Sequence, residues 1–226
     1  MRKNLISLFL IFFNIISIFG QIPIGHWSTH TPGAKVINVE KMHEKVFAAT
    51  PYEIFYYNTG DNSINKLSKV NGLSDFGVSV MRYNPATDHI FVGYTNANID
   101  LIDRNDNVTN INDIKIKDIL ADKTINDVYF IDEFAYVCCG FGIVVIDMSR
   151  LEVKDTYVIG RDGGYLNVND LTVYNGKFYA ATSSGVYYAD VDNENLADFS
   201  QWRRDMSIIH GVVNYSEIET FNNTLI

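Results

Sequence analysis

Residues that interrupt or staple a fold are scarce in this sequence, which has only four prolines and two cysteines among 226 residues. Cys138 and Cys139 are adjacent, and adjacent side chains of a strand point to opposite faces, so bridging them would need a strained turn. We therefore predict two buried, unbridged cysteines within a strand. Without a disulfide, the fold must rely on a hydrophobic core of some size.

Long apolar runs are absent after the first twenty residues. Residues 1–20 combine a basic start, Arg2 and Lys3, with an apolar run over 5–19, which is the layout of a secretory signal peptide. The rival interpretation, a membrane anchor, is disfavoured because the run is shorter than the roughly 20 apolar residues of a spanning helix. The sequence predicts a signal peptide over 1–20 and an exported protein over 21–226.

Positive charge is also scarce, since 18 Lys and Arg stand against 27 Asp and Glu, for a formal net charge of −9. Removal of Arg2 and Lys3 with the signal peptide would change −9 to −11. Phosphate backbones bind basic faces, so we expect no nucleic-acid partner.

A repeat of about 44 residues organises the rest of the chain. Four segments each contain an apolar strand, a tight turn, a second strand, a small-residue turn and a third strand. The second strands carry aromatic residues spaced by 44, 45 and 43 positions, at Phe47, Phe91, Tyr136 and Tyr179. The third strands begin at residues spaced by 45, 44 and 43 positions, at Ile54, Ile99, Ile143 and Val186.

This period, filled with short β-branched and aromatic runs, is typical of β-propeller blades. Helical repeats of similar length are disfavoured because the runs span only four to six residues. The predicted fold is all-β, a β-propeller with four blades and the start of a fifth, cut from a ring of about seven. The predicted blades are 36–68, 78–114, 125–159, 168–204 and, in part, 218–226. Trp27 is expected on a strand by which the N-terminus closes the ring.

Polar clusters that resemble catalytic or metal motifs fail on inspection. The run 103–107 resembles a calcium loop but lacks the required Gly and Glu, as does 190–194, and both are predicted to be hairpin tips. His26 and His30 lack the glutamate of a zinc-protease motif. Asn175 and Gly176 predict a two-residue hairpin turn. We expect no catalytic residue, no metal site and no cofactor.

Ligand binding is expected, if anywhere, in loops that a propeller places on one face. These loops are rich in Asn, Asp, Ser and Gly, which bind sugars and peptide edges but which any turn also prefers. The candidate ligand-binding residues are Asn71, Ser74, Asp75, Asn96, Asn98, Arg161 and Asp162.

Several short motifs resemble one family. The sequence Asn-Gly-Leu-Ser-Asp over 71–75 leads into a new blade, as in exported propellers of Bacteroidetes. The chain is similar to the first propeller of the PorZ family in further segments, namely 25–36, 47–50, 93–102, 141–145 and 155–160. Sensor propellers of hybrid two-component regulators share the loop but usually carry Trp-Ile-Gly-Thr where this chain has Phe-Ala-Ala-Thr.

The resemblance implies a non-enzymatic surface component of the type IX secretion system. PorZ-like proteins act with the sortase PorU and deliver anionic lipopolysaccharide to it, so these two are the implied partners. The implied location is the periplasm or the outer-membrane surface of a Gram-negative bacterium. A periplasmic ligand-sensing propeller is the alternative. A third possibility, a propeller glycosidase or lyase, requires carboxylates in the central channel, whereas the inward-facing positions of this sequence are predicted to be mostly apolar.

Overall fold

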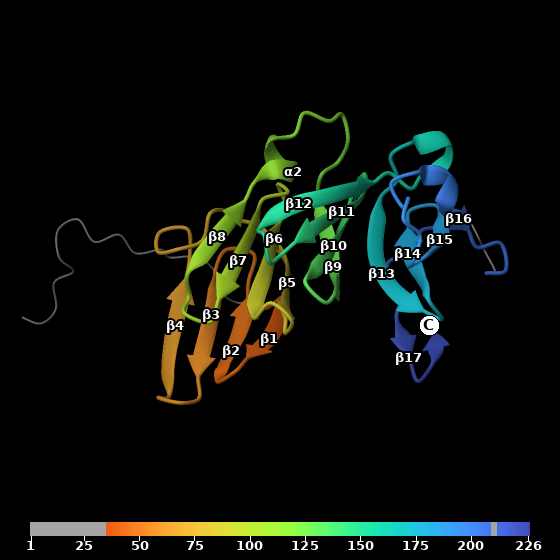
Figure 1. Cartoon of the computed structure of the whole chain (residues 1–226). Helices are drawn as coiled ribbons and strands as arrows, with labels where there is room; N and C mark the ends of the chain where they lie inside the picture. The colour runs from red at the N-terminus through yellow and green to blue at the C-terminus, as the bar shows by residue number, and fades with distance from the viewer. Residues whose placement is uncertain (1–34, 209–211) are drawn as a thin grey trace, which may run out of the picture. The chain divides into compact units, whose positions relative to one another are not determined.

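The computed structural model describes residues 35–208 and 212–226, and its strands all belong to one compact unit, Thr31–Ile226. The predicted signal peptide, Trp27, His26 and His30 lie outside the described residues. Four antiparallel sheets follow one another along the chain, each made of four consecutive strands in chain order (Figure 1). Each sheet is one blade of a β-propeller.

The strands of the first two blades are β1 Asn38–Met42, β2 Lys45–Ala49, β3 Ile54–Asn58, β4 Ser63–Leu67, β5 Val78–Asn84, β6 His89–Tyr94, β7 Ile99–Asp103 and β8 Val108–Ile111. The strands of the next two are β9 Ile125–Ile131, β10 Phe134–Cys139, β11 Gly142–Asp147, β12 Glu152–Tyr157, β13 Val168–Tyr174, β14 Lys177–Thr182, β15 Gly185–Asp190 and β16 Arg203–Arg204. A fifth blade starts with the hairpin of β17 Thr220–Phe221 and β18 Thr224–Leu225.

Turn chemistry fixes the hairpins. Asn175 and Gly176 join β13 to β14 and both have positive φ, 48° and 72°, which matches the right-handed twist of a two-residue hairpin. Asp132, at φ 49°, occupies the equivalent turn one blade earlier. The polar run after Asp103 is the predicted hairpin tip, because the Asp103 carboxylate accepts hydrogen bonds from the backbone N–H groups of Asn105 and Asn107.

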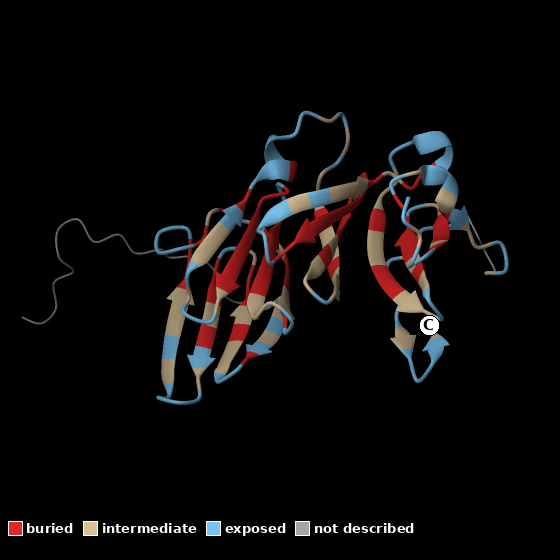
Figure 2. Cartoon of the chain, viewed as in Figure 1, coloured by how far each residue is buried: buried red, intermediate tan, exposed pale blue. Residues whose placement is uncertain are grey.

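The core lies between successive blades, and many strand residues are buried (Figure 2). Successive side chains of a strand point to its two faces, and so toward the two neighbouring sheets. Phe47 of β2 packs with Ile90 and Val92 of β6 in one cluster. Phe91 of β6 packs with Val137 of β10 in the next. The middle strands of the second and third blades are therefore buried on both faces, which explains their apolar runs.

The two cysteines follow the same alternation. Cys138 packs in the cluster between the third and fourth blades, and Cys139 packs between the second and third. Both are free and fully buried, as predicted. Burial raises the pKa of both thiols, so neither is poised to react as a thiolate.

Two connections differ from the sequence prediction. The second blade was expected to continue to Ile114, but β8 ends at Ile111 and Ile114 lies in the short helix α2 Asp113–Ile116, where its side chain is buried. The turn predicted at 190–194 is the start of a longer connection between β15 and β16. This connection contains the 3-10 helix η2 Phe199–Gln201 and places Trp202 in the core.

Bulges interrupt the first strands of the second, third and fourth blades. The register shifts between Val78 and Val80, and again between Val168 and Asp170. In the third blade it shifts between the β10 residues Cys138 and Cys139, opposite β9. Each bulge leaves one residue of the first strand without a ladder partner, respectively Ser79, Asn126 and Asn169. These three side chains line a cavity together with Asp127 and Asp170, whereas Val80, after the first bulge, packs in the core between the second and third blades.

Candidate functional site

The loops after second and fourth strands meet at one end of the first two blades, as the sequence predicted. The N–H of Gly77, in the β4–β5 loop, donates to the carbonyl of Pro51 in the β2–β3 loop at 2.7 Å. The carbonyl of Gly77 in turn accepts from the N–H of Thr95 in the β6–β7 loop at 2.8 Å. We call this set of three loops, 50–53, 68–77 and 95–98, the loop face.

Asn71 shapes the loop face from within. Its Oδ1 accepts from the backbone N–H of Ser68 at 2.6 Å and from the Ser68 hydroxyl at 2.8 Å, while its Nδ2 donates to the carbonyl of Lys66 at 2.7 Å. Leu73 then turns into the core between the first two blades. The side chain of Asn71 therefore stabilises the conformation of its own loop.

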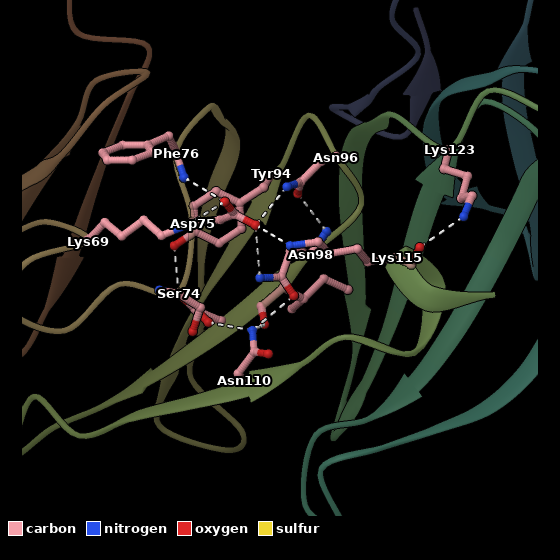
Figure 3. A network of polar contacts seen from close by, with 12 residues as sticks. Lys69, Ser74, Asp75, Phe76, Tyr94, Asn96, Asn98, Asn110, Lys115 and Lys123 are labelled. Carbon is pink, nitrogen blue, oxygen red and sulfur yellow. Dashed lines mark hydrogen bonds and ion pairs between the residues drawn. The ribbon is translucent and has the colours of Figure 1, made fainter.

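Asp75 is the centre of a polar network that joins three parts of the chain (Figure 3). Its Oδ2 accepts from Asn96 Nδ2 at 2.6 Å, from Asn98 Nδ2 at 3.4 Å and from Lys115 Nζ of α2 at 2.5 Å. Its Oδ1 accepts from Lys69 Nζ at 3.1 Å. The residue is only 8% exposed, so the carboxylate is satisfied almost entirely by protein groups.

The electrostatics of Asp75 follow from these contacts. Burial by itself raises its pKa, but hydrogen bonds from Lys115, Asn96 and Lys69 outweigh burial and hold the pKa of Asp75 well below its usual value. The carboxylate is therefore ionised at all physiological pH values. It serves as a fixed anion that anchors two lysines and the β6–β7 loop.

A second buried carboxylate, Asp100 on β7, continues the network. Asp100 Oδ2 accepts from the N–H of Ser74 at 2.8 Å and from the hydroxyl of Tyr94 at 2.6 Å. Asn110 Nδ2 donates to both Asp100 Oδ1, at 2.9 Å, and Asn98 Oδ1, at 3.0 Å. Burial and the Asp100 carboxylate raise the pKa of Tyr94, which stays a neutral donor.

Of the seven predicted site residues, the structure brings Ser74, Asp75, Asn96 and Asn98 into this one network. Sequence reasoning missed Asp100, Tyr94 and Lys115. A usable signal existed for Asp100, because a carboxylate within the apolar run Ile-Asp-Leu-Ile must be buried and therefore hydrogen-bonded. No local signal points to Lys115, which lies 40 residues from Asp75.

The surface above this network combines cations with an aromatic ring. Lys69 and Lys115 expose 44% and 40% of their side chains, and Phe76 is 45% exposed. The Lys69 ammonium lies 5.3 Å from the centre of the Phe76 ring. Asp75 accepts hydrogen bonds from the Lys69 and Lys115 ammonium groups and from the N–H of Phe76, so the buried carboxylate holds these three residues near one another.

Arg161 and Asp162 lie apart from the network, in the 3-10 helix η1 Arg161–Gly163 that follows β12. They form an exposed ion pair, with Arg161 Nε 3.4 Å from Asp162 Oδ2. Both residues line a cleft of about 390 Å³ between η1 and the η2 segment. The seven predicted residues thus fall into two separate regions.

The first strands of the blades hold a further polar group, which corrects the prediction that inward-facing positions are mostly apolar. A cavity of about 610 Å³ is lined by Arg82 of β5, Asp127 of β9, Asp170 of β13 and Glu217. The expectation was wrong because the bulges turn Asn126–Asp127 and Asn169–Asp170 out of the interblade cores.

Two carboxyl groups of this cavity interact directly. Burial is the main cause that raises the pKa of Asp170 to about 6, assisted by the charge and the hydrogen bond of Asp127. Asp170 Oδ2 also accepts from the N–H of Ile218 at 2.8 Å, at the start of the fifth blade. Arg82 Nη2 lies 3.3 Å from Asp127 Oδ1. Both carboxyl groups therefore join neighbouring blades.

Two asparagines, Asn126 and Asn169, also form hydrogen bonds between neighbouring blades. Asn126 Nδ2 donates to the carbonyl of Val168 in the next blade at 2.7 Å and to Asn167 Oδ1 at 2.9 Å. Asn169 Nδ2 donates in the equivalent way to the carbonyl of Tyr215 at 2.6 Å and to Asn214 Oδ1 at 2.9 Å. The bulged asparagines therefore link the third blade to the fourth and the fourth to the fifth.

Within residues 35–208 and 212–226, no cluster of three or more His, Cys, Asp and Glu side chains is arranged to hold a metal ion. None of the helices in this part of the chain could cross a membrane. Four blades and the start of a fifth define the class of the protein, a β-propeller.

The sequence profile of the type IX secretion system PorZ N-terminal β-propeller domain matches residues 46–203. The chain therefore belongs to the PorZ N-terminal β-propeller family. No curated protein matches it.

Solved structures share the propeller fold. PorZ, an essential surface component of the type IX secretion system of Porphyromonas gingivalis, is similar with a TM-score of 0.65 and 24% identity, over 75% of this chain and 22% of PorZ. The extracellular domain of BT4673 of B. thetaiotaomicron, described as a one-component or hybrid two-component system, is similar in two structures. Their TM-scores are 0.65 and 0.66 at 12% identity, over 88% of this chain and 27% and 26% of theirs. The chain thus spans about a quarter or less of each protein.

Proposed function

We propose that this chain is part of an exported, non-enzymatic adaptor of the type IX secretion system, which helps to deliver anionic lipopolysaccharide to a PorU-like sortase at the cell surface. The observation that carries the proposal is the family match over 46–203, which includes nearly all of the four blades. The predicted signal peptide is consistent with export.

The loop face supports an adaptor role rather than catalysis. Asp75 of the loop face and Asp100 of β7 both accept internal hydrogen bonds, so neither carboxylate is free to act as a general acid or base. What reaches solvent is a rigid set of cations and a ring at Lys69, Phe76 and Lys115. Exposed aromatic side chains are common anchors of protein interfaces.

Deletion of the gene from its host tests the proposal. We expect secreted cargo to lose its lipopolysaccharide modification, visible as loss of the diffuse high-mass bands on a gel, and to regain it with the wild-type gene. Complementation with Phe76→Ala should restore modification less well than complementation with Tyr57→Ala. Tyr57 is a matched control, because it is similarly exposed at 40% but lies toward the β3–β4 hairpin, away from the loop face.

The sensor function is the second candidate, favoured by the similarity in fold to the BT4673 extracellular domain over 88% of this chain. If the chain is part of a sensor, deletion of its gene would leave cargo modification intact and would instead abolish the transcriptional response to a particular nutrient. That result would overturn the adaptor proposal.

A further inference from the structure

A cleft in the fourth blade has the composition of a ligand site. It measures about 390 Å³, which falls within the usual size range of small-molecule sites. Three aromatic side chains line it, Tyr187 of β15 and Phe199 and Trp202 of the η2 segment. Tyr187 and Trp202 are nearly buried and therefore fixed, whereas Phe199 is 42% exposed. The cleft offers flat apolar walls to a ligand.

Arg204 brings an unpaired positive charge to these walls. It faces Tyr187 across the β15–β16 ladder, so both side chains lie on the same face of the sheet. Its Nε is buried and has no hydrogen-bond partner among the described residues, and its Nη2 contacts only the sulfur of Met206, at 3.4 Å. Guanidinium N–H groups are strong donors, and leaving a buried one unsatisfied is unfavourable.

The carboxylates near the cleft do not neutralise Arg204. Asp205, next in the chain, accepts instead from the N–H and hydroxyl of Ser207 at 2.8 and 2.6 Å. Asp162 pairs with Arg161 across 3.4 Å, but both side chains are about nine-tenths exposed, so water competes with that pair. The cleft therefore carries a net positive charge in a chain whose formal net charge is −9.

From these observations the geometry points to a binding site for a carboxylate carried on a ring, with the carboxylate on Arg204 and Arg161 and the ring against Phe199 and Trp202. The planar fork of a guanidinium matches a carboxylate in a bidentate pair. Two sources share this chemistry, a hexuronic acid and an aromatic acid. The inference rests on the cleft alone and is independent of the proposed secretion role.

Calorimetric titration of the full chain with galacturonate and with phenylacetate tests the site, using galactose and phenylacetamide as neutral counterparts. We expect at least one acid to bind, and the one that binds identifies the source. Its neutral counterpart should bind about 10-fold more weakly or not at all. The site is refuted if neither acid binds, or if an acid and its neutral counterpart bind equally.

Variants of neighbouring arginines locate the binding. Arg204→Met keeps the apolar part of the side chain and should lower the affinity for the acid about 10-fold or more. Arg203→Met is the matched control, because Arg203 is exposed, pairs with Tyr188 in the ladder and does not line the cleft. Circular dichroism checks folding, and Arg204→Lys, which keeps the charge but loses the fork, should also bind more weakly. Equal affinity of wild type and a folded Arg204 variant would overturn the proposal.

Discussion

Replacement of Asp170 by Asn should change the pH dependence of stability in a defined direction. Asp170 lies in a cavity whose other charged groups are Arg82, Asp127, Glu217 and Glu219. Because its pKa is raised from 3.8 to about 6, the folded state holds a proton that the unfolded state releases. The free energy of unfolding of the wild type therefore falls as pH rises from about 4 to about 6.

The magnitude follows from the same pKa values. The difference between 3.8 and about 6 corresponds to about 3 kcal/mol. Asp170 is only half-buried, so solvent screens the charge and we reduce the expected effect to about 1–2 kcal/mol. Asn keeps an oxygen to accept from the N–H of Ile218, and its amide can donate to Asp127. Asp170→Asn should therefore be more stable than wild type by this amount at pH 8, with little difference at pH 4.

Urea unfolding followed by circular dichroism at pH 4, 5, 6, 7 and 8 measures the effect. The control is Asp192→Asn, on an exposed connection outside the cavity. Its free energy of unfolding should change with pH in the same way as that of the wild type. If Asp170→Asn destabilises the chain equally at pH 4 and pH 8, the raised pKa of Asp170 does not contribute to stability as argued, and the reasoning above is wrong.

Three further substitutions probe the loops and seams by urea unfolding. Asp75→Asn should cost about 2–4 kcal/mol at pH 7, because it leaves the Lys115 ammonium without its anion. It should also flatten the acid limb of the stability curve, since the lowered pKa of Asp75 gives wild type stability that is lost as pH falls below about 4. Asn126→Ala should lower the free energy of unfolding by about 1–3 kcal/mol, because it removes two hydrogen bonds between blades. Its control, Ser79→Ala, should lower it by less than about 1 kcal/mol, because the Ser79 hydroxyl donates within its own sheet. Gly176→Ala should cost about 1–2 kcal/mol for its positive φ alone, because a Cβ there would contact nothing.

The fold could be predicted from sequence because each blade repeats local signals. Buried middle strands produce apolar runs, and tight hairpins require residues such as Asn175 and Gly176 at fixed places. These signals depend only on residues within a few positions of one another, so they can be recognised without any knowledge of tertiary contacts. The connections were less predictable, because α2 and η2 are short and are held by packing of Ile114 and Trp202 rather than by helical periodicity.

The site was predictable only in part. Loop composition selected Asp75 and Asn96, and the structure joins these two side chains by a hydrogen bond of 2.6 Å. It could not distinguish a residue that is consumed by its own loop, such as Asn71, from one that organises several loops. That distinction depends on which residue distant in sequence contacts the carboxylate. Lys115, which donates to Asp75, lies in a helix that the sequence did not predict.

The bulges explain why the inner carboxylates were missed and what they do. Strict alternation assigns Asp127 and Asp170 no special place, but one extra residue in each first strand turns them toward the next blade. There, Asp170 holds the N–H of Ile218 and Asn169 holds the carbonyl of Tyr215, so a donor and an acceptor of the incoming blade are both satisfied. Apolar packing between blades is non-directional and does not by itself fix how one blade lies on the next. The hydrogen bonds between neighbouring blades supply that directionality. The polar side chains of the first strands therefore position neighbouring blades relative to one another.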